Sequence, residues 1–455
     1  MIKMKLRMVT LAMCLVCCLS AIAQSSDALV DKLVEKGVIS VSEANTLRDE
    51  SDKDFNKAIA LKNGMPEWVS TLKINGDFRG RFDELIIDNG SKAVNVNDRE
   101  RFRYRARLGI TANMFDGLEV GLRLTSGDDY STTPNIGGSQ FSGNTTMNND
   151  ASRKFVFIDL AYAKYTPFKC TELQFGKMVN QFWVSPMIIS PDYTPEGAQQ
   201  KISFNLNDNN KLNIVGGEWV VNENNPGRDV YALAGQLDLS SKWTDKLSSR
   251  VGLMTYTFVN PSQTTAGVEA FVANSNNGTP LAGTSVQANG LTYGAQEFNP
   301  VIGRADLTYT LDKFPIYKGK FPITVYGEYV NNPSANGNIT AANGTITSQP
   351  YDGLQNDAYT IGTTFGNAKD RGNWQVGYAY KNVGAASLWR GLMDDNFGYG
   401  GKGGTDVRGH VVSVSYRVYT PLLLQAQYFN TEAITQTSKY QGQTDRILVD
   451  MNLSF

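Results

Sequence analysis

Hydrophobic and polar side chains alternate along most of this chain. In the run RERFRYRARLGIT, residues 99–111, Phe102, Leu108 and Ile110 share one side of the pattern, and arginines occupy the other. A period of two predicts a β-strand with two unlike faces. The earlier run KINGDFRGRF, residues 73–82, repeats this design. Each of these strands therefore presents one apolar face and one strongly polar face.

The same alternation continues to the end of the chain and predicts an all-β fold of about sixteen antiparallel strands. We expect these strands at about 72–82, 100–112, 118–126, 153–165, 171–179, 200–207, 211–220, 229–239, 246–259, 300–311, 321–331, 357–365, 373–383, 407–419, 422–430 and 444–455. A strand of about ten residues matches a tilted crossing of the hydrocarbon core of a membrane.

The connections between the expected strands alternate between long and short. They are long at 83–99 and 127–152 and short at 113–117 and 166–170, and this rhythm continues along the chain. Long outer loops and short inner turns are typical of a transmembrane β-barrel, which turns its apolar face to lipid and its polar face to water. A soluble sheet with one solvated face is the alternative, but it gives no reason for loops sorted by length.

The first residues predict export. Lys3, Lys5 and Arg7 precede the apolar stretch 8–19, and the small residues at 21–23 suit a cleavage site. We therefore expect a signal peptide over 1–23. After it, no apolar run reaches the length of a membrane-spanning helix.

Two further regions follow the expected signal peptide. Residues 24–66 predict a short helical periplasmic leader, because apolar residues recur there at helical spacing and Gly37 suits a helix end. This leader could also be a flexible tether, an oligomerisation element or a contact with the cell-wall layer. Residues 67–455 predict the outer-membrane β-barrel.

The last expected strand ends on Phe455. Ile447, Val449, Met451 and Leu453 share its apolar face. A final amphipathic strand that closes on a phenylalanine resembles the address read by the barrel assembly machinery of the outer membrane. We therefore expect that machinery as a partner and Phe455 as an assembly signal.

The polar face of the first three expected strands predicts one basic wall. Its members, which we expect to line the pore, are Lys73, Arg79, Arg81, Arg101, Arg103, Arg105, Arg107 and Arg123. Neighbouring strands lie about 4.8 Å apart, so these like charges would repel unless other groups compensate them. A barrel of this size encloses water rather than a packed core.

Carboxylates on the third long loop, expected at 180–199, are candidates for that compensation. If the loop folds into the lumen, Asp192 and Glu196 would form a constriction opposite the arginines. On an outer surface loop they would have no such role. Further acids expected on lumenal faces are Glu218, Asp238, Asp306 and Glu328.

Other chemistry has little support in the sequence. The net charge of -1 makes nucleic acid an unexpected partner. Only Cys170 follows the signal peptide, which excludes an intrachain disulfide. His410 is the only histidine, and no metal cluster or phosphate loop is evident, so we expect no cofactor and no enzyme. A membrane-embedded Ser–His hydrolase that uses His410 is the enzymatic alternative.

Three stretches carry a resemblance to a known family. They are LVDKLVEKGVISVSEANTL at 29–47, the pair GDFRGRF and RERFRYRARLGIT, and LQFGKMVNQFW at 173–183 with PDYTPEGAQ at 191–199. Together they resemble the Bacteroidetes-type putative porins of the outer membrane. The resemblance implies an outer-membrane β-barrel more firmly than it implies any particular solute.

We therefore expect an outer-membrane porin that allows passive diffusion of small hydrophilic solutes, with a weak preference for anions from the arginine wall. The alternatives are a substrate-specific channel and a non-conducting barrel used for anchoring or adhesion. Outer-membrane lipid would surround the barrel. Barrels of this class often form homotrimers, and the sequence leaves the oligomeric state open.

Overall fold

The computed structural model describes the barrel strands and most of their connections. The described residues are 34, 43, 46, 68–89, 98–128, 142–148, 150–223, 229–259, 286–288, 291–293, 298–335, 338–341, 346–348, 355–398, 404–434 and 442–455. The chain divides into two compact units, Met1–Leu72 and Lys73–Phe455, and the barrel is the second.

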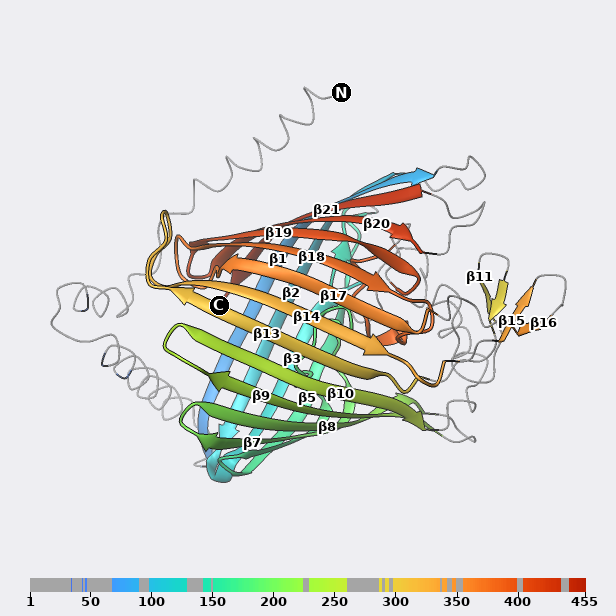
Figure 1. The fold of residues 1–455 in the computed structure, drawn as a ribbon. Helices are drawn as coiled ribbons and strands as arrows, with labels where there is room; N and C mark the ends of the chain where they lie inside the picture. The colour runs from blue at the N-terminus through green and yellow to red at the C-terminus, as the bar shows by residue number, and fades with distance from the viewer. Residues whose placement is uncertain are drawn as a thin grey trace. The chain divides into compact units, whose positions relative to one another are not determined.

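Sixteen strands follow one another around one sheet, each antiparallel to its neighbours, and the prediction of about sixteen is confirmed (Figure 1). They are β1 (Val69–Asn89), β2 (Arg99–Met114), β3 (Leu118–Gly127), β5 (Phe155–Phe168), β6 (Thr171–Lys177), β7 (Glu196–Asn207), β8 (Asn210–Asn222), β9 (Val230–Lys242), β10 (Leu247–Val259), β13 (Val301–Leu311), β14 (Phe321–Asn331), β17 (Asp357–Gly366), β18 (Trp374–Val383), β19 (Val407–Tyr419), β20 (Leu422–Ala433) and β21 (Gly442–Ser454). A short strand, β4 (Thr145–Thr146), pairs with β2.

The first and last strands close the sheet into a barrel. β1 pairs with β21 in antiparallel register, so that Phe78 faces Leu453 and Phe82 faces Val449. Beyond the ladder, the Phe455 N–H donates to the Gly76 carbonyl at 3.0 Å, and the Gly76 N–H donates back to the Phe455 carbonyl at 3.0 Å. Closure removes the free edges that an open sheet would leave unpaired.

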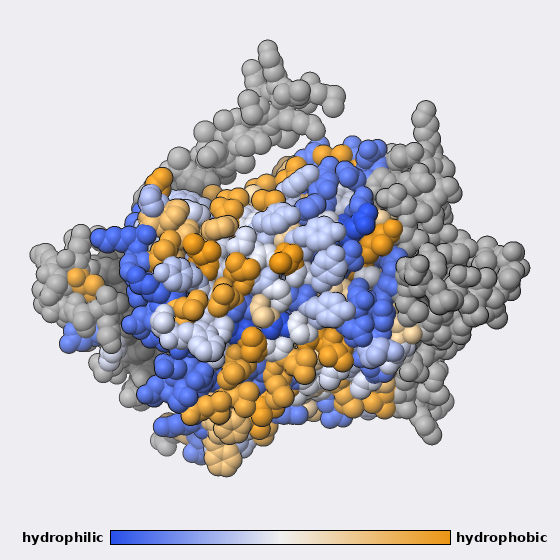
Figure 2. Space-filling model, in the orientation of Figure 1, coloured by the Kyte–Doolittle hydropathy of each residue, from blue (hydrophilic) through white to orange (hydrophobic). Residues whose placement is uncertain are grey.

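The alternation in the sequence sorts side chains to the two faces of the wall. On β2, Phe102 is 52% exposed and Leu108 49%, whereas the intervening Arg103 is 3% exposed. The apolar residues therefore face outward and the arginines inward. Figure 2 shows one outer face of the barrel, on which most hydrophobic side chains gather between two hydrophilic margins. This is the surface that a bilayer requires.

The two ends of the barrel differ in the length of their connections. At one end the strands are joined by tight turns such as η2 (Phe115–Gly117) and Asp208–Asn209. At the other end the connections are long (Figure 1). Two of the long ones contribute a separate four-stranded sheet of β11 (Val286–Ala288), β12 (Leu291–Tyr293), β15 (Asn338–Ala341) and β16 (Ile346–Ser348).

Aromatic side chains gather beside the turns. Phe314 stacks on Phe321 with ring centroids 4.0 Å apart, and Tyr317 and Trp374 pack edge-on against them. Phe115, Phe168, Trp243 and Tyr419 are also exposed near this end. Such amphipathic rings are stable at a membrane–water interface.

Two long connections fold into the barrel instead of leaving it. One is the segment 178–195 between β6 and β7, and the other is 384–398 between β18 and β19, which contains η3 (Arg390–Leu392). Met187 and Ile188 of the first and Leu388 and Leu392 of the second are buried in one apolar cluster with inward-facing wall residues such as Trp219. The expectation that the lumen holds water rather than a packed core is therefore wrong where these two segments lie.

Several expectations fall largely outside the described residues. The expected signal peptide lies there entirely, and of the expected helical leader only residues 34, 43 and 46 are described, each as helix. Among the residues that the structure describes, no helix is long and apolar enough to cross a membrane.

Candidate functional site

The arginines of the expected basic wall lie on the inward faces of three adjacent strands. They are Arg79 and Arg81 on β1, Arg101, Arg103, Arg105 and Arg107 on β2, and Arg123 on β3. The arginines on the half of β2 nearest the long connections are nearly inaccessible to solvent, since Arg101 is 7% exposed and Arg105 8%. Lys73, the remaining member of the predicted set, is exposed near the start of β1. Other groups therefore cover most of this wall.

Asp83 is fully buried on β1 and lies at the centre of the part of the basic wall nearest the long connections. Its carboxylate accepts hydrogen bonds from Arg101 at 2.6 Å and from Arg446 of β21 at 2.9 and 3.0 Å. The guanidinium of Arg103 lies 3.7 Å away. One buried carboxylate is thus surrounded by three guanidinium groups.

Three more aspartates of the wall compensate four of the remaining arginines. Asp450 of β21 accepts two hydrogen bonds from Arg81, both 2.7 Å long. Asp77 accepts from Arg105 at 3.0 Å and from Arg107 at 2.7 Å. Asp159 of β5 accepts from Arg123 at 2.5 Å. The like charges of the basic wall are therefore offset mainly within the wall itself.

Sequence reasoning did not assign these wall aspartates a role. Asp77 and Asp83 share the parity of Arg79 and Arg81, so the alternation alone contains the signal that places all four on one face. Asp450 stands apart from β1 by most of the chain, and only closure of the barrel brings it to Arg81. Its parity is readable in the sequence, but its partner is not.

The inward segment 178–195 reaches the wall through Asp192. Its carboxylate accepts a hydrogen bond from Arg105 at 2.8 Å and lies 3.8 Å from a nitrogen of Arg79. The structure therefore brings Asp192 to the arginines. It does not bring Glu196 there, because Glu196 is already the first residue of β7. Strand alternation leaves its side chain exposed and paired with Lys177 at 3.0 Å.

The second inward segment, 384–398, also contacts the wall. Arg446 donates to the Asp395 carbonyl at 3.0 Å, and Arg81 donates to the Asn396 side chain at 3.4 Å. The sequence analysis did not single out this segment. A signal was present in the apolar run SLWRGLM at 387–393, which would be costly to expose on an outer loop.

The two inward segments are joined to each other by backbone hydrogen bonds. The Ser190 N–H donates to the Leu392 carbonyl at 2.6 Å, and the Asp394 N–H donates to the Pro186 carbonyl at 3.1 Å. Their apolar side chains pack in the same buried cluster. The segments therefore form one unit, which we call the inner plug, residues 178–195 and 384–398.

The opposite wall holds the inner plug by different contacts. The Ser185 N–H and hydroxyl both donate to the carboxylate of Glu328 on β14. The Trp183 N–H donates to the side chain of Gln236 on β9 at 2.7 Å, and Gln236 donates back to the Trp183 carbonyl at 2.9 Å. Segment 178–195 is thus tied to both sides of the lumen.

The other expected lumenal acids divide between the two faces. Asp238, Asp306 and Glu328 face inward; Asp238 pairs with Arg250 at 2.8 Å, and Asp306 with Arg304 at 3.2 Å. Glu218 is exposed on the outward face of β8, because its neighbour Trp219 is the buried, inward residue. The expectation for Glu218 is therefore wrong by one position of the alternation.

His410 lies on the outward face of β19. Its Nδ1 is 2.8 Å from the hydroxyl of Tyr378, and its ring lies 5.1 Å from that of Tyr380. These contacts form an aromatic group on the outer surface of the barrel. Among the described residues, no group of three or more His, Cys, Asp or Glu side chains could hold a metal ion.

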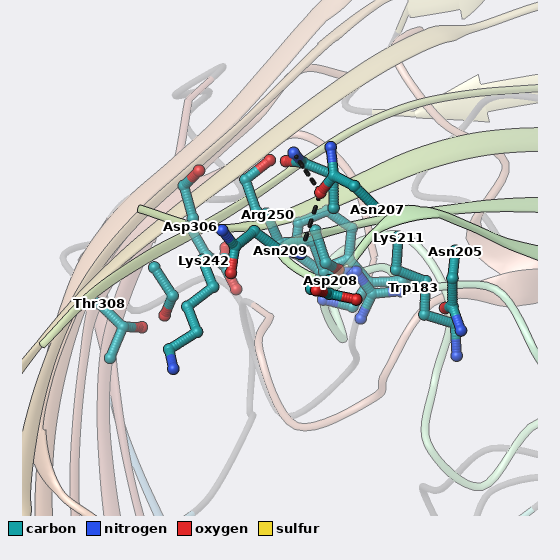
Figure 3. A pocket seen from close by; sticks show the side chains of 15 residues that line it. Trp183, Asn205, Asn207, Asp208, Asn209, Lys211, Lys242, Arg250, Asp306 and Thr308 are labelled. Atoms are coloured by element: carbon teal, nitrogen blue, oxygen red, sulfur yellow. Dashed lines mark hydrogen bonds between the residues drawn. The ribbon is translucent and has the colours of Figure 1, made fainter. Parts of the chain in front are cut away.

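A polar cavity of about 820 Å³ lies inside the turn end of the barrel (Figure 3). Asparagine and serine side chains of β7, β8, β9, β10 and the β7–β8 turn form the larger part of its lining. Thr308 and the charged side chains of Asp208, Lys211, Lys242, Arg250 and Asp306 contribute the rest. Trp183 of the inner plug also lines it. The lumen therefore has two unlike halves, a packed plug toward the long connections and a polar cavity at the turns.

One carboxyl of the inner plug responds to pH near neutrality. Burial and the charge of Asp395 raise the pKa of Asp394 to about 6, although Asn396 and Lys381 favour the charged form. Asp192 is a further acid that faces it. As pH falls through about 6, Asp394 therefore loses its negative charge and the plug becomes more positive.

We expect this change to appear in ion selectivity. Lowering the pH from about 7.5 to about 5 should shift the reversal potential in a salt gradient toward anions, because one negative charge leaves the lumen. Asp394→Asn should give the acidic value at both pH values. Histidine is the other side chain that commonly changes charge in this range, so His410→Gln, on the outer surface, is the control and should keep the shift. A full shift in Asp394→Asn would contradict the assignment.

The fold and the lumen define a class of protein. A closed barrel with an apolar outer surface, charged inner walls, short turns at one end and inward-folded connections is the architecture of a bacterial outer-membrane channel. The structure of OprB from Pseudomonas putida is similar, with a TM-score of 0.51, 12% identity, and coverage of 84% of this chain and 94% of that chain. At this identity the likeness shows the fold alone.

The sequence itself shows the family. Residues 92–279 and 271–455 match the family model described as "Putative porin", which together is well over half of the chain, and the protein belongs to that family. The outer membrane channel DcaP of Acinetobacter baumannii has a TM-score of 0.43 and 12% identity, covering 85% of this chain and 97% of that chain. No functionally curated protein matches the sequence. The protein is thus a porin-type channel located in the outer membrane.

Proposed function

We propose that this channel admits small hydrophilic solutes by passive diffusion past the inner plug, with a weak preference for anions. The observation that carries the proposal is the position of Asp192. Its segment is tied to one wall of the lumen through Trp183, and Asp192 contacts Arg105 and Arg79 on the opposite wall. A polar solute that passes this point meets positive charge on one side and negative charge on the other. Such a transverse field favours polar solutes over apolar ones.

The weak preference follows from the charges of the wall. Eight arginines on β1, β2, β3 and β21 take part in the ion pairs of this wall: Arg79, Arg81, Arg101, Arg103, Arg105, Arg107, Arg123 and Arg446. Five aspartates face them: Asp77, Asp83, Asp159, Asp192 and Asp450. The excess is eight minus five, or three positive charges, before the nearby Asp394 and Asp395 are counted. A small excess supports a small preference.

The arginines nearest the turn-end opening should set that preference. Arg107 and Arg123 are 18% and 21% exposed in their side chains, more than the outer arginines of the wall. Replacing both with glutamine should lower the anion-to-cation permeability ratio by about twofold to fivefold, since each charge contributes up to about 1 kcal/mol in water. The measurement is the reversal potential of single channels in planar bilayers under a salt gradient.

Arg408→Gln is the matched control for this test. Arg408 is also paired with an acid, Glu432 at 2.7 Å, but on the outward face of β19. It should leave the reversal potential unchanged. Open channels whose ion preference is the same in all three proteins would keep the channel and remove the arginine wall as its filter.

A second candidate function, a non-conducting barrel for anchoring or adhesion, is favoured by one observation. The inner plug places packed apolar side chains inside the lumen. Under this alternative the refolded barrel would show no unitary currents at any salt concentration. The same bilayer recordings therefore separate the two functions.

Assembly and surroundings form part of the proposal. Outer-membrane lipid covers the apolar face of the barrel. The strand β21, with its outward Val449, Met451 and Leu453, would be read by the barrel assembly machinery together with Phe455. A homotrimer is consistent with the porin family, and the recordings would reveal it as current steps in groups of three.

A further inference from the structure

Trp183 is held in a fixed position at the inner side of the polar cavity. Its peptide group is clamped in both directions by Gln236, at 2.7 and 2.9 Å. Its half-buried ring lines the cavity with side chains from five strands, β7, β8, β9, β10 and β13 (Figure 3). A clamped backbone removes the freedom that a loop tryptophan would otherwise lose on binding a ligand.

The ring of Trp183 lies against one patch of the wall. The guanidinium carbons of Arg250 and Arg304 are 4.1 and 4.5 Å from its ring centroid. Gly252 lies between them, two residues from Arg250 and directly opposite Arg304 in the ladder. A Cβ at Gly252 would come within 3.1 Å of the ring. Glycine at this position therefore lets the ring approach the wall closely.

The two arginines are neutralised where they stand. Arg250 donates to Asp238 at 2.8 Å, and Arg304 donates to both oxygens of Asp306 at 3.2 and 3.3 Å. They therefore hold the ring by cation–π contact without leaving two uncompensated positive charges on the cavity wall. An anionic solute gains less from such paired guanidinium groups than from free ones.

The rest of the cavity offers mainly amides and hydroxyls, together with the charged side chains of Asp208, Lys211 and Lys242. Asn205, Asn207, Asn209 and Asn210 come from the β7–β8 turn, and serines from β9 and β10 face them. An amide side chain donates and accepts, and a hydroxyl does the same. A volume of about 820 Å³ lies within the range of binding pockets for small organic ligands. Amide and hydroxyl side chains outnumber the charged ones, and the charged ones include both acids and bases, so this lining suits a solute that carries many hydroxyl groups and no net charge.

We propose that the cavity is a binding subsite for neutral polyhydroxylated solutes, mono- or oligosaccharides, whose ring C–H face stacks on Trp183 while the asparagine and serine side chains bond their hydroxyls. This inference rests on the proposed channel function and names the solute class. A saturable subsite next to the inner plug would raise the local concentration of such solutes at the narrow part of the path.

The test uses the neutral trisaccharide raffinose in single-channel recordings. Added on the turn side, it should interrupt the ion current in a concentration-dependent and saturable way. Trp183→Ala should weaken this block roughly tenfold, the loss expected for one stacking contact, and Trp183→Tyr should keep most of it. The matched control is Trp374→Ala, which removes a tryptophan that packs with Phe314 and Tyr317 beside the turns, outside the cavity lining, and should not change the block.

Two further measurements separate stacking from mere support of the inner plug. A polyethylene glycol of similar mass should not saturate. The ion current without sugar depends on the conformation of the inner plug. If Trp183→Ala changes this current but leaves the raffinose affinity unchanged, Trp183 only supports the plug, and the subsite is overturned. Tighter block by inorganic phosphate than by raffinose would also overturn it, in favour of an anion site.

The failure of the subsite and the failure of the channel are distinguishable. Normal currents with no raffinose block would remove the subsite and keep the channel. If no currents appear, raffinose can still be titrated against the tryptophan fluorescence of the whole protein in detergent, with Trp183→Ala as reference. Binding that depends on Trp183 would then keep the subsite without conduction, and no binding would overturn it.

Discussion

Asp83→Asn should destabilise the folded barrel by about 3–5 kcal/mol, the cost typical of removing one partner from a buried ion pair. The carboxylate is fully buried and lies within 4 Å of Arg101, Arg103 and Arg446. Asparagine has nearly the same shape but no charge, so three guanidinium groups would face one another without it. The measurement is the urea midpoint of the refolded barrel in detergent.

Asp88→Asn is the matched control for this prediction. Asp88 lies five residues further along β1, with an exposed, outward side chain. Its substitution should change the free energy of unfolding by less than about 0.5 kcal/mol, as is usual for an exposed surface position, and should therefore leave the urea midpoint nearly unchanged. Adding Arg101→Gln to Asp83→Asn should recover part of the loss, because one unpaired positive charge leaves the cluster. Equal midpoints for Asp83→Asn and Asp88→Asn would contradict the central role of Asp83.

The strands and their two faces can be predicted from the sequence because alternation is a local property. Each residue's face depends only on its neighbours, which is why Arg103 and Phe102 fall on the expected sides. One error concerns a strand boundary, and another concerns the face assigned to a residue within a strand. β7 begins at Glu196 instead of about residue 200, and that earlier start turns Glu196 outward. Glu218 is expected on the inward face of β8, but its neighbour Trp219 is the buried, inward residue, so Glu218 faces outward.

The inner plug could not be predicted in the same way. Its contacts join segments far apart in the chain, such as Ser190 with Leu392, and irregular segments have no period from which a face can be read. The compensation of the arginine wall has the same origin, because Arg81 finds Asp450 only after β21 closes on β1. The charged residues are visible in the sequence, but the strand pairing of the closed barrel determines which of them form ion pairs.

Leu392→Asp should expel segment 384–398 from the lumen and raise the unitary conductance severalfold. Leu392 is fully buried in the apolar cluster of the inner plug. A carboxylate there would cost several kcal/mol without a partner, whereas the segment can leave the barrel without breaking any strand pairing. Water would then occupy the space now filled by Leu388, Leu392 and Phe397. Single-channel recordings in planar bilayers measure the change.

Leu392→Met is the control, because methionine keeps nearly the same volume and apolar character and should leave the conductance unchanged. Loss of the plug should also remove the pH step assigned to Asp394, since its carboxyl would move into bulk water with the segment. The unitary conductance and the pH dependence of the reversal potential should therefore change together, because both depend on segment 384–398. A severalfold larger conductance that retains the pH step would show that Asp394 acts elsewhere. An unchanged conductance in a folded Leu392→Asp barrel would mean that solutes pass along the wall without crossing the space that the plug occupies.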